Sequence, residues 1–168
     1  WLDSNGGATA TDACGGVMWT NDFDGLSIAC GPTGSATVMF TATDDCGNAT
    51  TTTATFTIED TIAPDVMAAA DATVECDGAG NIGDLDAWIA SNGGATAMDD
   101  CSGVTWSNDY TGTVMDCGST STVTVTFTAT DACGNATTTS ATFTVLDTVA
   151  PEFTQVPGDQ SNECEELA

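Results

Sequence analysis

The chain has 168 residues, among them 25 Asp and Glu but no Lys, Arg or His, so its formal net charge is −25. Without cationic side chains it has nothing to neutralise nucleic-acid phosphates or to hold an anionic lipid surface. Without His it can form neither a Ser-His-Asp triad nor an imidazole metal site. We therefore expect no enzyme, no nucleic-acid partner and no membrane insertion.

The composition also indicates the compartment. The hydrophobic fraction of 41% is too high for a disordered acidic tail. We find no apolar run of about 18 residues that would span a membrane, and the first residues, WLDSNGG, do not resemble a signal peptide. Eight Cys in a Thr- and Gly-rich chain are typical of an oxidising environment. The expected location is extracellular, at the cell surface or beyond it.

A repeat accounts for most of the chain. The segment WLDSNGGATATDACGGVMWTNDF at Trp1 recurs at Trp88 as WIASNGGATAMDDCSGVTWSNDY, an offset of 88 − 1 = 87 residues. One residue is inserted after the second repeat's last proline, so Cys76 matches Cys164 at an offset of 164 − 76 = 88. Three more pairs of cysteines follow the offset of 87, namely Cys14 and Cys101, Cys30 and Cys117, and Cys46 and Cys133.

The repeat boundaries are marked by proline. The segments DTIAP at 60–64 and DTVAP at 147–151 each follow a β-patterned run and end in Pro, which is typical of a linker. We therefore expect a repeat lacking its first strand at 1–64, a complete repeat at 65–150, and the first strand of a following repeat at 151–168. Two arrangements stay open, a window of a longer array and a strand donated to a neighbouring subunit.

In chain order, the complete repeat begins with a strand within 65–75 and continues with a short helix at 84–91. Asp84 is predicted to cap this helix, and Gly93 to end it. One face of the helix is apolar, formed by Leu85, Trp88 and Ile89.

Four further strands follow. Segment 95–98 and the segment with Val104 and Trp106 are short, whereas two longer runs alternate apolar residues with Thr. A Gly-Asn turn joins these runs into a hairpin. The pattern predicts an all-β fold of tandem Ig-like β-sandwich repeats of about 87 residues, each with one short helix and two disulfides.

The strand order of such a sandwich ranks the three connectivities that four Cys allow. Two loop cysteines fall at the N-terminal pole and two at the opposite pole. The predicted disulfides are Cys76–Cys117, Cys101–Cys133 and, in the first repeat, Cys14–Cys46. Cys30 and Cys164 are then expected to bond to neighbouring repeats or subunits, because an intramolecular Cys30–Cys164 bond would require the array to fold back. A zinc site is disfavoured, since no CxxC spacing occurs.

Several carboxylates are expected to meet where two repeats join. In the predicted topology the N-terminal loops of one repeat face the linker before it. A Ca²⁺ ion suits such a group, because it takes 6–8 oxygen ligands in flexible geometry. The alternative is that these acids simply favour turns, and no DxDxDG loop is present. The predicted ligands are Asp60, Asp65, Asp99, Asp100 and Asp131.

Three other functions are weighed against simpler explanations. Asp99 and Asp131 could pair as in a glycosidase, but a small sandwich offers little cleft. The Thr-rich strand faces could bind ice or glycan, although Thr commonly occupies the solvent side of a strand. Asn48 and Asn135 match the N-glycosylation sequon, yet the hairpin turn already explains these Asn residues.

The motifs VEC, DLDAWIASNGGATAxDxC, VTWSND, VTFTATDxCGNAxTT and DTxAP, in this order, resemble hyalin-like (HYR-type) Ig-fold repeats. Such repeats occur in long secreted surface proteins of Bacteroidota-type bacteria, and the resemblance covers essentially the whole chain. It implies export and use in adhesins or extracellular filaments. It also implies O-glycosylation at Asp-Thr-aliphatic motifs, which Thr61 and Thr148 match.

Together these features predict a structural repeat of an extracellular filament or stalk-like cell-surface adhesin, held by disulfides and rigidified by Ca²⁺. Its partners are expected to be neighbouring copies of the same repeat or subunit. The alternative is an adhesion module that binds glycan or another surface.

Overall fold

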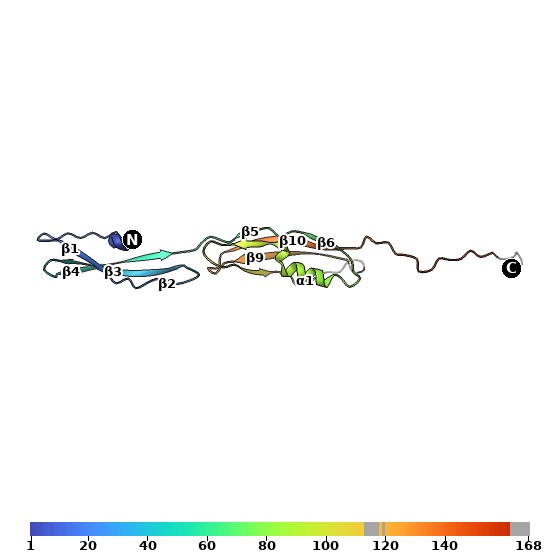
Figure 1. Cartoon of the computed structure of the whole chain (residues 1–168), viewed down its shortest axis with the longest axis horizontal. Helices are drawn as coiled ribbons and strands as arrows, with labels where there is room; N and C mark the ends of the chain where they lie inside the picture. Colours follow the sequence, from blue (N-terminus) through green and yellow to red (C-terminus); the bar gives the residue numbers. More distant parts are fainter. Residues whose placement is uncertain (113–117, 119, 162–168) are drawn as a thin grey trace.

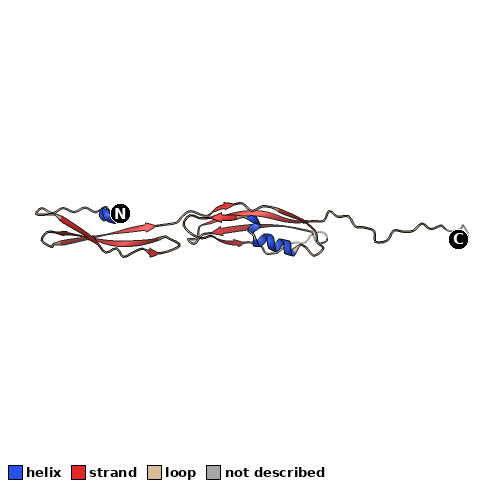
Figure 2. Ribbon diagram, in the orientation of Figure 1, coloured by secondary structure: helices blue, strands red, loops and turns tan. Residues whose placement is uncertain are grey.

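The computed structural model describes residues 1–112, 118 and 120–161. They form an elongated molecule in which two β-rich bodies lie end to end and an extended segment trails from the second (Figure 1). We call residues 1–58 the front unit, 65–146 the rear unit, 59–64 the linker and 147–161 the tail. The fold is mostly β, as predicted, and the described residues contain one α-helix (Figure 2).

The front unit is a four-stranded antiparallel sheet centred on β3 (Gly34–Asp44). β4 (Ala49–Ile58) pairs along nearly all of β3, while β1 (Val17–Asn21) and β2 (Ser27–Ile28) pair with its two ends. A short 3-10 segment, η1 (Leu2–Gly7), precedes these strands. It places Trp1 over the sheet, where the indole packs edge-on against Phe40 at 5.4 Å between ring centroids.

The rear unit contains two sheets and one α-helix. Its main sheet has the order β6-β10-β9-β8, in which β6 runs parallel to β10 and the other pairs are antiparallel. A second, two-stranded sheet pairs β5 with β7. The bounds are β5 (Asp65–Met67), β6 (Ala72–Glu75), α1 (Ile82–Ala90), η2 (Asn92–Gly94), β7 (Thr96–Met98), β8 (Thr105–Asn108), β9 (Ser121–Thr130) and β10 (Ala136–Leu146).

The core of the rear unit follows from the period-2 pattern of its two long strands. Apolar side chains on one face of β9 and β10 are buried, while the intervening Thr residues are more exposed. Helix α1 covers this face with Leu85, which packs on Phe143 and Val145. Trp88 meets Phe127 edge-on at 5.4 Å between ring centroids. The arrangement repeats the Trp1–Phe40 contact of the front unit.

Two predicted details are wrong. The expected strand at 65–75 is two strands, β5 and β6, because residues 68–71 turn the chain from one sheet to the other. Helix α1 starts earlier than predicted, since its N-cap is Asn81, in a left-handed conformation with φ 54°. Asp84 lies in the first turn, where it accepts a hydrogen bond of 2.9 Å from Asn81 Nδ2. The acid therefore supports the helix start without being its cap.

The predicted disulfide Cys101–Cys133 is also wrong. Cys133 is bonded to Cys30, 103 residues away in sequence, and Cys101 is a free thiol. The predicted topology places Cys133 at the N-terminal pole of its repeat. Cys117 falls at the opposite pole, and so does Cys30, its counterpart in the first repeat. In an end-to-end arrangement these two poles meet, so the bond forms between the units. Cys30 is thus bonded to the neighbouring repeat of the same chain, one of the two alternatives expected for it, although its partner is Cys133 and not a first-strand cysteine.

The predicted Cys14–Cys46 bond is absent as well, since both are free thiols. Their loops are close, because the Gly16 amide donates to Asp45 Oδ2 at 3.0 Å. Each Cys lies in a turn closed by its own aspartate, Asp12 or Asp44. Cys117 and Cys164 lie outside the described residues, and with them the predicted Cys76–Cys117 bond and the partner of Cys164. The described residues thus hold one disulfide, between units, and not two in each repeat.

Among the helices of the described ranges, none is both long enough and apolar enough to cross a lipid bilayer.

Candidate functional site at the junction of the two units

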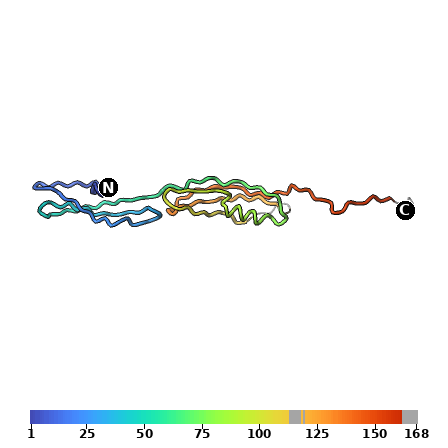
Figure 3. Tube along the Cα trace, in the orientation of Figure 1, coloured from blue at the N-terminus to red at the C-terminus, as the bar shows by residue number. Residues whose placement is uncertain are grey.

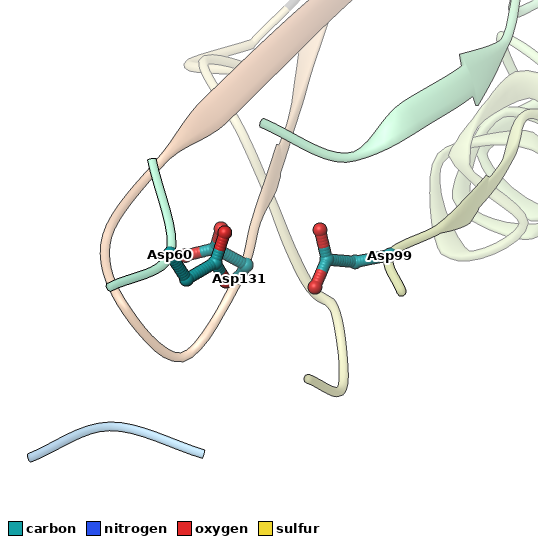
Figure 4. Close-up of side chains that lie close together, drawn as sticks. All are labelled: Asp60, Asp99 and Asp131. Atoms are coloured by element: carbon teal, nitrogen blue, oxygen red, sulfur yellow. The ribbon is translucent and has the colours of Figure 1, made fainter. Parts of the chain in front are cut away.

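Three carboxylates from separate parts of the chain meet where the linker enters the rear unit (Figure 4). Asp60 belongs to the linker, Asp99 follows β7, and Asp131 begins the turn between β9 and β10. Each offers one oxygen, and these oxygens all lie within 4.8 Å of one another. We call Asp60, Asp99 and Asp131 the acidic triad. The predicted convergence is therefore present for three of the five acids.

Asp131 is the most rigidly held member. It is buried, and its Oδ1 accepts hydrogen bonds from the amides of Cys133 and Asn135 at 2.8 and 2.9 Å. Its Oδ2 accepts from Asn135 Nδ2 at 2.8 Å. Desolvation raises the pKa of this carboxyl, but the hydrogen bonds from Asn135 and Cys133 outweigh it and lower the pKa overall. Asp131 thus stays an anion at neutral pH.

Asp99 and Asp60 are half-buried, and among the described residues the hydrogen bonds to each reach only one of its two carboxylate oxygens. Asp99 Oδ1 accepts from the amides of Cys101 and Ser102 at 3.0 and 2.8 Å. Asp60 Oδ1 accepts from the Ile62 amide at 3.2 Å. Asp60 Oδ2 is buried and has no hydrogen-bond partner among the described residues. A buried carboxylate oxygen without a donor is costly, so this atom marks the place where a cation would be favoured.

The other two predicted ligands lie beside the triad. Asp65 and Asp100 are exposed, and both line a hollow of about 210 Å³ together with Asp60 and Asp99. Asp65 begins β5, where it pairs with Met98 across the small sheet. The structure thus groups four of the predicted acids around one hollow, and the fifth, Asp131, lies close to two of them, Asp60 and Asp99.

Sequence reasoning missed the residues that fix the linker. Asn135 Nδ2 donates to the Asp60 carbonyl at 3.1 Å, and Thr137 Oγ1 donates to the Pro64 carbonyl at 2.7 Å. The repetition of DxCGN in both repeats is the available signal, but by itself this motif predicts only a hairpin turn. In the structure this turn also binds the preceding linker. The side-chain amide of Asn135 therefore donates to both Asp60 and Asp131, and it is not free for N-glycosylation.

The disulfide lies at the same junction. Thr33 is buried and closes the Cys30 turn, with Oγ1 donating to the Cys30 carbonyl at 2.6 Å. Gly31 has φ +53°, and a Cβ added there would come within 3.1 Å of the Cys101 carbonyl oxygen. The turn that carries Cys30 is therefore pressed against the loop of Cys101, and the two units touch as well as being covalently linked.

The free thiol of Cys101 has a raised pKa, and the acids around it contribute to this shift. Desolvation raises its pKa first, and the negative charges of Asp60, Asp99, Asp100 and Asp131 raise it further. A thiolate is disfavoured where four carboxylates surround the sulfur. Since the chain contains no Lys, Arg or His, this negative charge has no side-chain counterion.

The far pole of the front unit provides an internal comparison. Asp12 and Asp44 match Asp99 and Asp131 at the offset of 87. Asp44 accepts from the amides of Cys46 and Asn48 as Asp131 does from Cys133 and Asn135, and Asp12 accepts from the Cys14 amide as Asp99 does from Cys101. Asn48 Nδ2 donates to Asp44 Oδ2 at 2.7 Å, as Asn135 does to Asp131. Within the described part of the chain, however, no third carboxylate joins this pair as Asp60 joins the other.

The two predicted glycosylation sites differ in their surroundings. Thr61 and Thr148 are both exposed. Thr148 Oγ1 donates to Glu75 Oε2 at 2.9 Å, and its amide donates to Glu75 Oε1 at 2.7 Å. A glycan on Thr148 would therefore compete with an existing bond.

No family model matches the chain, and no curated protein matches it.

Proposed function

We propose that this chain is a structural repeat of an extracellular filament or stalk-like cell-surface adhesin, in which β-sandwich units are fixed end to end and Ca²⁺ stiffens each junction. The observation that carries the proposal is the Cys30–Cys133 bond, which fastens the end of one unit to the start of the next. A disulfide is compatible with an extracellular location. The resemblance to HYR-type repeats of secreted surface proteins points the same way.

The acidic triad supports the role of calcium. Ca²⁺ binds oxygen at about 2.4 Å, so two oxygens on one ion lie at most about 4.8 Å apart. The triad oxygens meet this limit, and Asp60 Oδ2 still needs a positive partner. Asp65 and Asp100 border the same hollow and could complete the coordination directly or through water. Because Asp60 is in the linker and its partners are in the rear unit, an ion here would lock the linker.

The substitution Asp60→Asn tests this role with a definite sign. In this variant the side-chain amide oxygen keeps the bond from the Ile62 amide, while an NH₂ group replaces the unpartnered oxygen and faces two carboxylates. We expect Asp60→Asn to raise the melting temperature in EDTA and to abolish the rise that millimolar Ca²⁺ gives the wild-type chain. The measurement is intrinsic Trp fluorescence during heating, with and without Ca²⁺.

Asp147→Asn is the matched control. Asp147 occupies the place of Asp60 in the next linker, and its Oδ1 accepts from the Val149 amide at 3.2 Å, as Asp60 does from Ile62. Among the described residues Asp147 belongs to no group of three acids close enough to share an ion. In a chain that ends at residue 151, and so lacks the tail beyond the linker, Asp147→Asn should therefore respond to Ca²⁺ like its parent. Wild-type melting that Ca²⁺ leaves unchanged would refute the calcium site.

The filament role is tested by shape. Small-angle scattering and electron microscopy should show rod-like particles whose maximum dimension exceeds that of a compact protein of this mass. Retention of a single chain on a glycan array, with compact particles, would favour the alternative of a binding module.

A further inference from the structure

The two units differ at one sheet edge. In the rear unit β10 has β9 on one side and β6 on the other. Its counterpart β4 pairs only with β3 among the described residues. The difference changes burial, because Phe143 and Val145 are each 2% exposed whereas their counterparts Phe56 and Ile58 are each 39% exposed. The front unit therefore presents an open edge with apolar side chains beside it.

A hollow of about 330 Å³ continues this open edge, and Trp1, Leu2, Phe23 and Phe56 are among its lining residues. The corresponding place in the rear unit is filled by Leu85. There Leu85 belongs to a core cluster with Phe143, and Trp88, Ile89 and Tyr110 pack against this cluster. These four residues match Trp1, Leu2, Phe23 and Phe56 of the hollow at the offset of 87. The hollow therefore has the shape of a site that an added segment fills in the other unit.

The rear unit also shows the polar contacts that such a segment makes. The Thr142 amide donates to Asp71 Oδ1 at 2.7 Å, just before the β6–β10 ladder begins. At the other end Glu75 accepts two bonds from Thr148. The counterparts of Thr142 and Thr148 in the front unit are Thr55 and Thr61. A segment with an acid at each end, four residues apart, would meet matching donors there.

The C-terminal segment carries this pattern. Asp159 and Glu163 have the spacing of Asp71 and Glu75, and Cys164 follows as Cys76 does, all at an offset of 88. Glu163 and Cys164 lie outside the described residues and enter only through their sequence. In the described part, residues 152–161 form no strand, and the side chains of Phe153 and Val156 are 86% and 74% exposed. This segment thus has unsatisfied apolar surface of its own.

We propose that the open edge of β4 is a docking site for residues 152–164 of a second copy of this chain, which add to β4 as a parallel strand as β6 adds to β10. This docking rests on the proposed filament role, and it identifies the partner as a second copy of the same chain. The edge belongs to the first unit and the segment leaves the far end of an elongated molecule (Figure 3), so the contact joins successive copies head to tail. A head-to-tail contact that does not close on itself generates a fibre.

The same docking would rebuild the acidic triad. The linker before the donated segment carries Asp147, the counterpart of Asp60. When the segment enters the front unit of the next copy, Asp147 comes to the pole that holds Asp12 and Asp44. This pair is the counterpart of Asp99 and Asp131. The pair Asp12 and Asp44 thus gains from the neighbouring copy the carboxylate that corresponds to Asp60.

The donated segment is a weaker match than the segment inside the rear unit. Gln160 and Ser161 take the places of Ala72 and Thr73, and residues 152–164 carry no counterpart of Leu85. Recognition then depends on the backbone ladder and the two acids. A peptide of residues 65–87 contains the strand and Leu85 together, and it serves as the positive control for an accessible edge.

The test compares the full chain with a variant ending at residue 151. Sedimentation velocity should show that the average mass of the full chain increases with concentration while the shortened chain stays a monomer. A labelled peptide of residues 152–168 should bind the shortened chain in fluorescence anisotropy. Ile58→Asp should reduce this affinity at least tenfold, whereas Met18→Asp, at an exposed position on β1, should leave it unchanged.

Two outcomes would overturn the proposal. One is equal peptide binding by the Ile58→Asp chain, with melting showing that it is folded. The other is binding of peptide 65–87 without binding of peptide 152–168, which would assign the edge to a segment of another source. Rod shape and the calcium response are measured on the shortened monomer as well, so failure of docking is distinguishable from failure of the proposed function.

Discussion

Asn135 shows how one side chain can serve two purposes in a repeat. Its amide and side chain bond Asp131, which closes the β9–β10 turn, and its Nδ2 also holds the Asp60 carbonyl of the linker. The sequence predicted the turn, because Gly-Asn is a strong hairpin signal. It could not predict the second contact, since the linker partner lies 75 residues earlier in the chain.

The hydrogen bonds of Asn135 make the stability of the rear unit depend on pH. They lower the pKa of Asp131 below its ordinary value of 3.8. A carboxyl with a lowered folded-state pKa stabilises the fold above that ordinary value, and the stabilisation is lost as pH falls through the folded pKa. We expect wild type to exceed Asn135→Ala in stability at pH 6, with a difference that shrinks toward pH 2. Urea denaturation at several pH values measures the free energy of unfolding of both chains. A difference between them that does not change with pH would contradict the role assigned to the Asp131 carboxylate.

Cys101 provides a chemical readout of the acidic triad. Only the thiolate is alkylated, and desolvation together with the surrounding carboxylates raises the pKa of this thiol. We expect iodoacetamide to modify Cys101 faster in Asp60→Asn than in wild type at pH 8. Ca²⁺ should accelerate the wild-type reaction, because a bound cation offsets the same charges. Peptide mass spectrometry follows the site, with Cys14 as internal reference.

At the scale of elements, the alternation of Thr with apolar residues predicted β9 and β10 and their buried face. This signal is strong because every second side chain must point into the core. The start of α1 was predicted poorly, since Asn81 reaches its left-handed N-cap through bonds to Glu75 and Asp84 that no local pattern reveals. The division of 65–75 into two strands likewise depends on which sheet each half joins.

Matched positions of the β3–β4 and β9–β10 hairpins differ in the exposed fraction of their side chains, so the energetic cost of truncating them can be compared directly. Phe143 is covered by α1 and β6, whereas its counterpart Phe56 is partly exposed. Phe143→Ala should cost about 3–5 kcal/mol of the free energy of unfolding of the rear unit. Phe56→Ala should cost the front unit less than half of that. Chemical denaturation followed by circular dichroism measures both, and equal costs would contradict the difference in burial.

At the scale of the whole molecule, the sequence predicted a bond from Cys30 to a neighbouring repeat or subunit, but not that its partner is Cys133. The cysteine pairing was inferred for a sandwich considered by itself, and in such a unit Cys30 has no partner. Stacking the units end to end brings Cys30 to Cys133. The acids of the junction were predictable for the same geometric reason, because they lie on loops that face the preceding linker.

The cross-junction bond should dominate the coupling of the units. It closes a loop of about 103 residues, for which the loss of chain entropy in the unfolded state corresponds to roughly 4–5 kcal/mol. Cys30→Ser should therefore lower the stability by up to this amount and broaden the distribution of maximum dimensions in small-angle scattering. Cys14→Ser, at a free thiol on the far pole, should change neither.

The position of this bond determines where a pulling force travels. Tension applied along the molecule can pass from the Cys30 turn through two sulfur atoms into the β9–β10 turn, so the peptide backbone at 59–64 is not the only covalent path for the load. The linker can then hold its carboxylates in place while the molecule is stretched. A chain built this way would lengthen only when a covalent bond breaks or a whole sheet shears, and it would act under strain as a tether of fixed length.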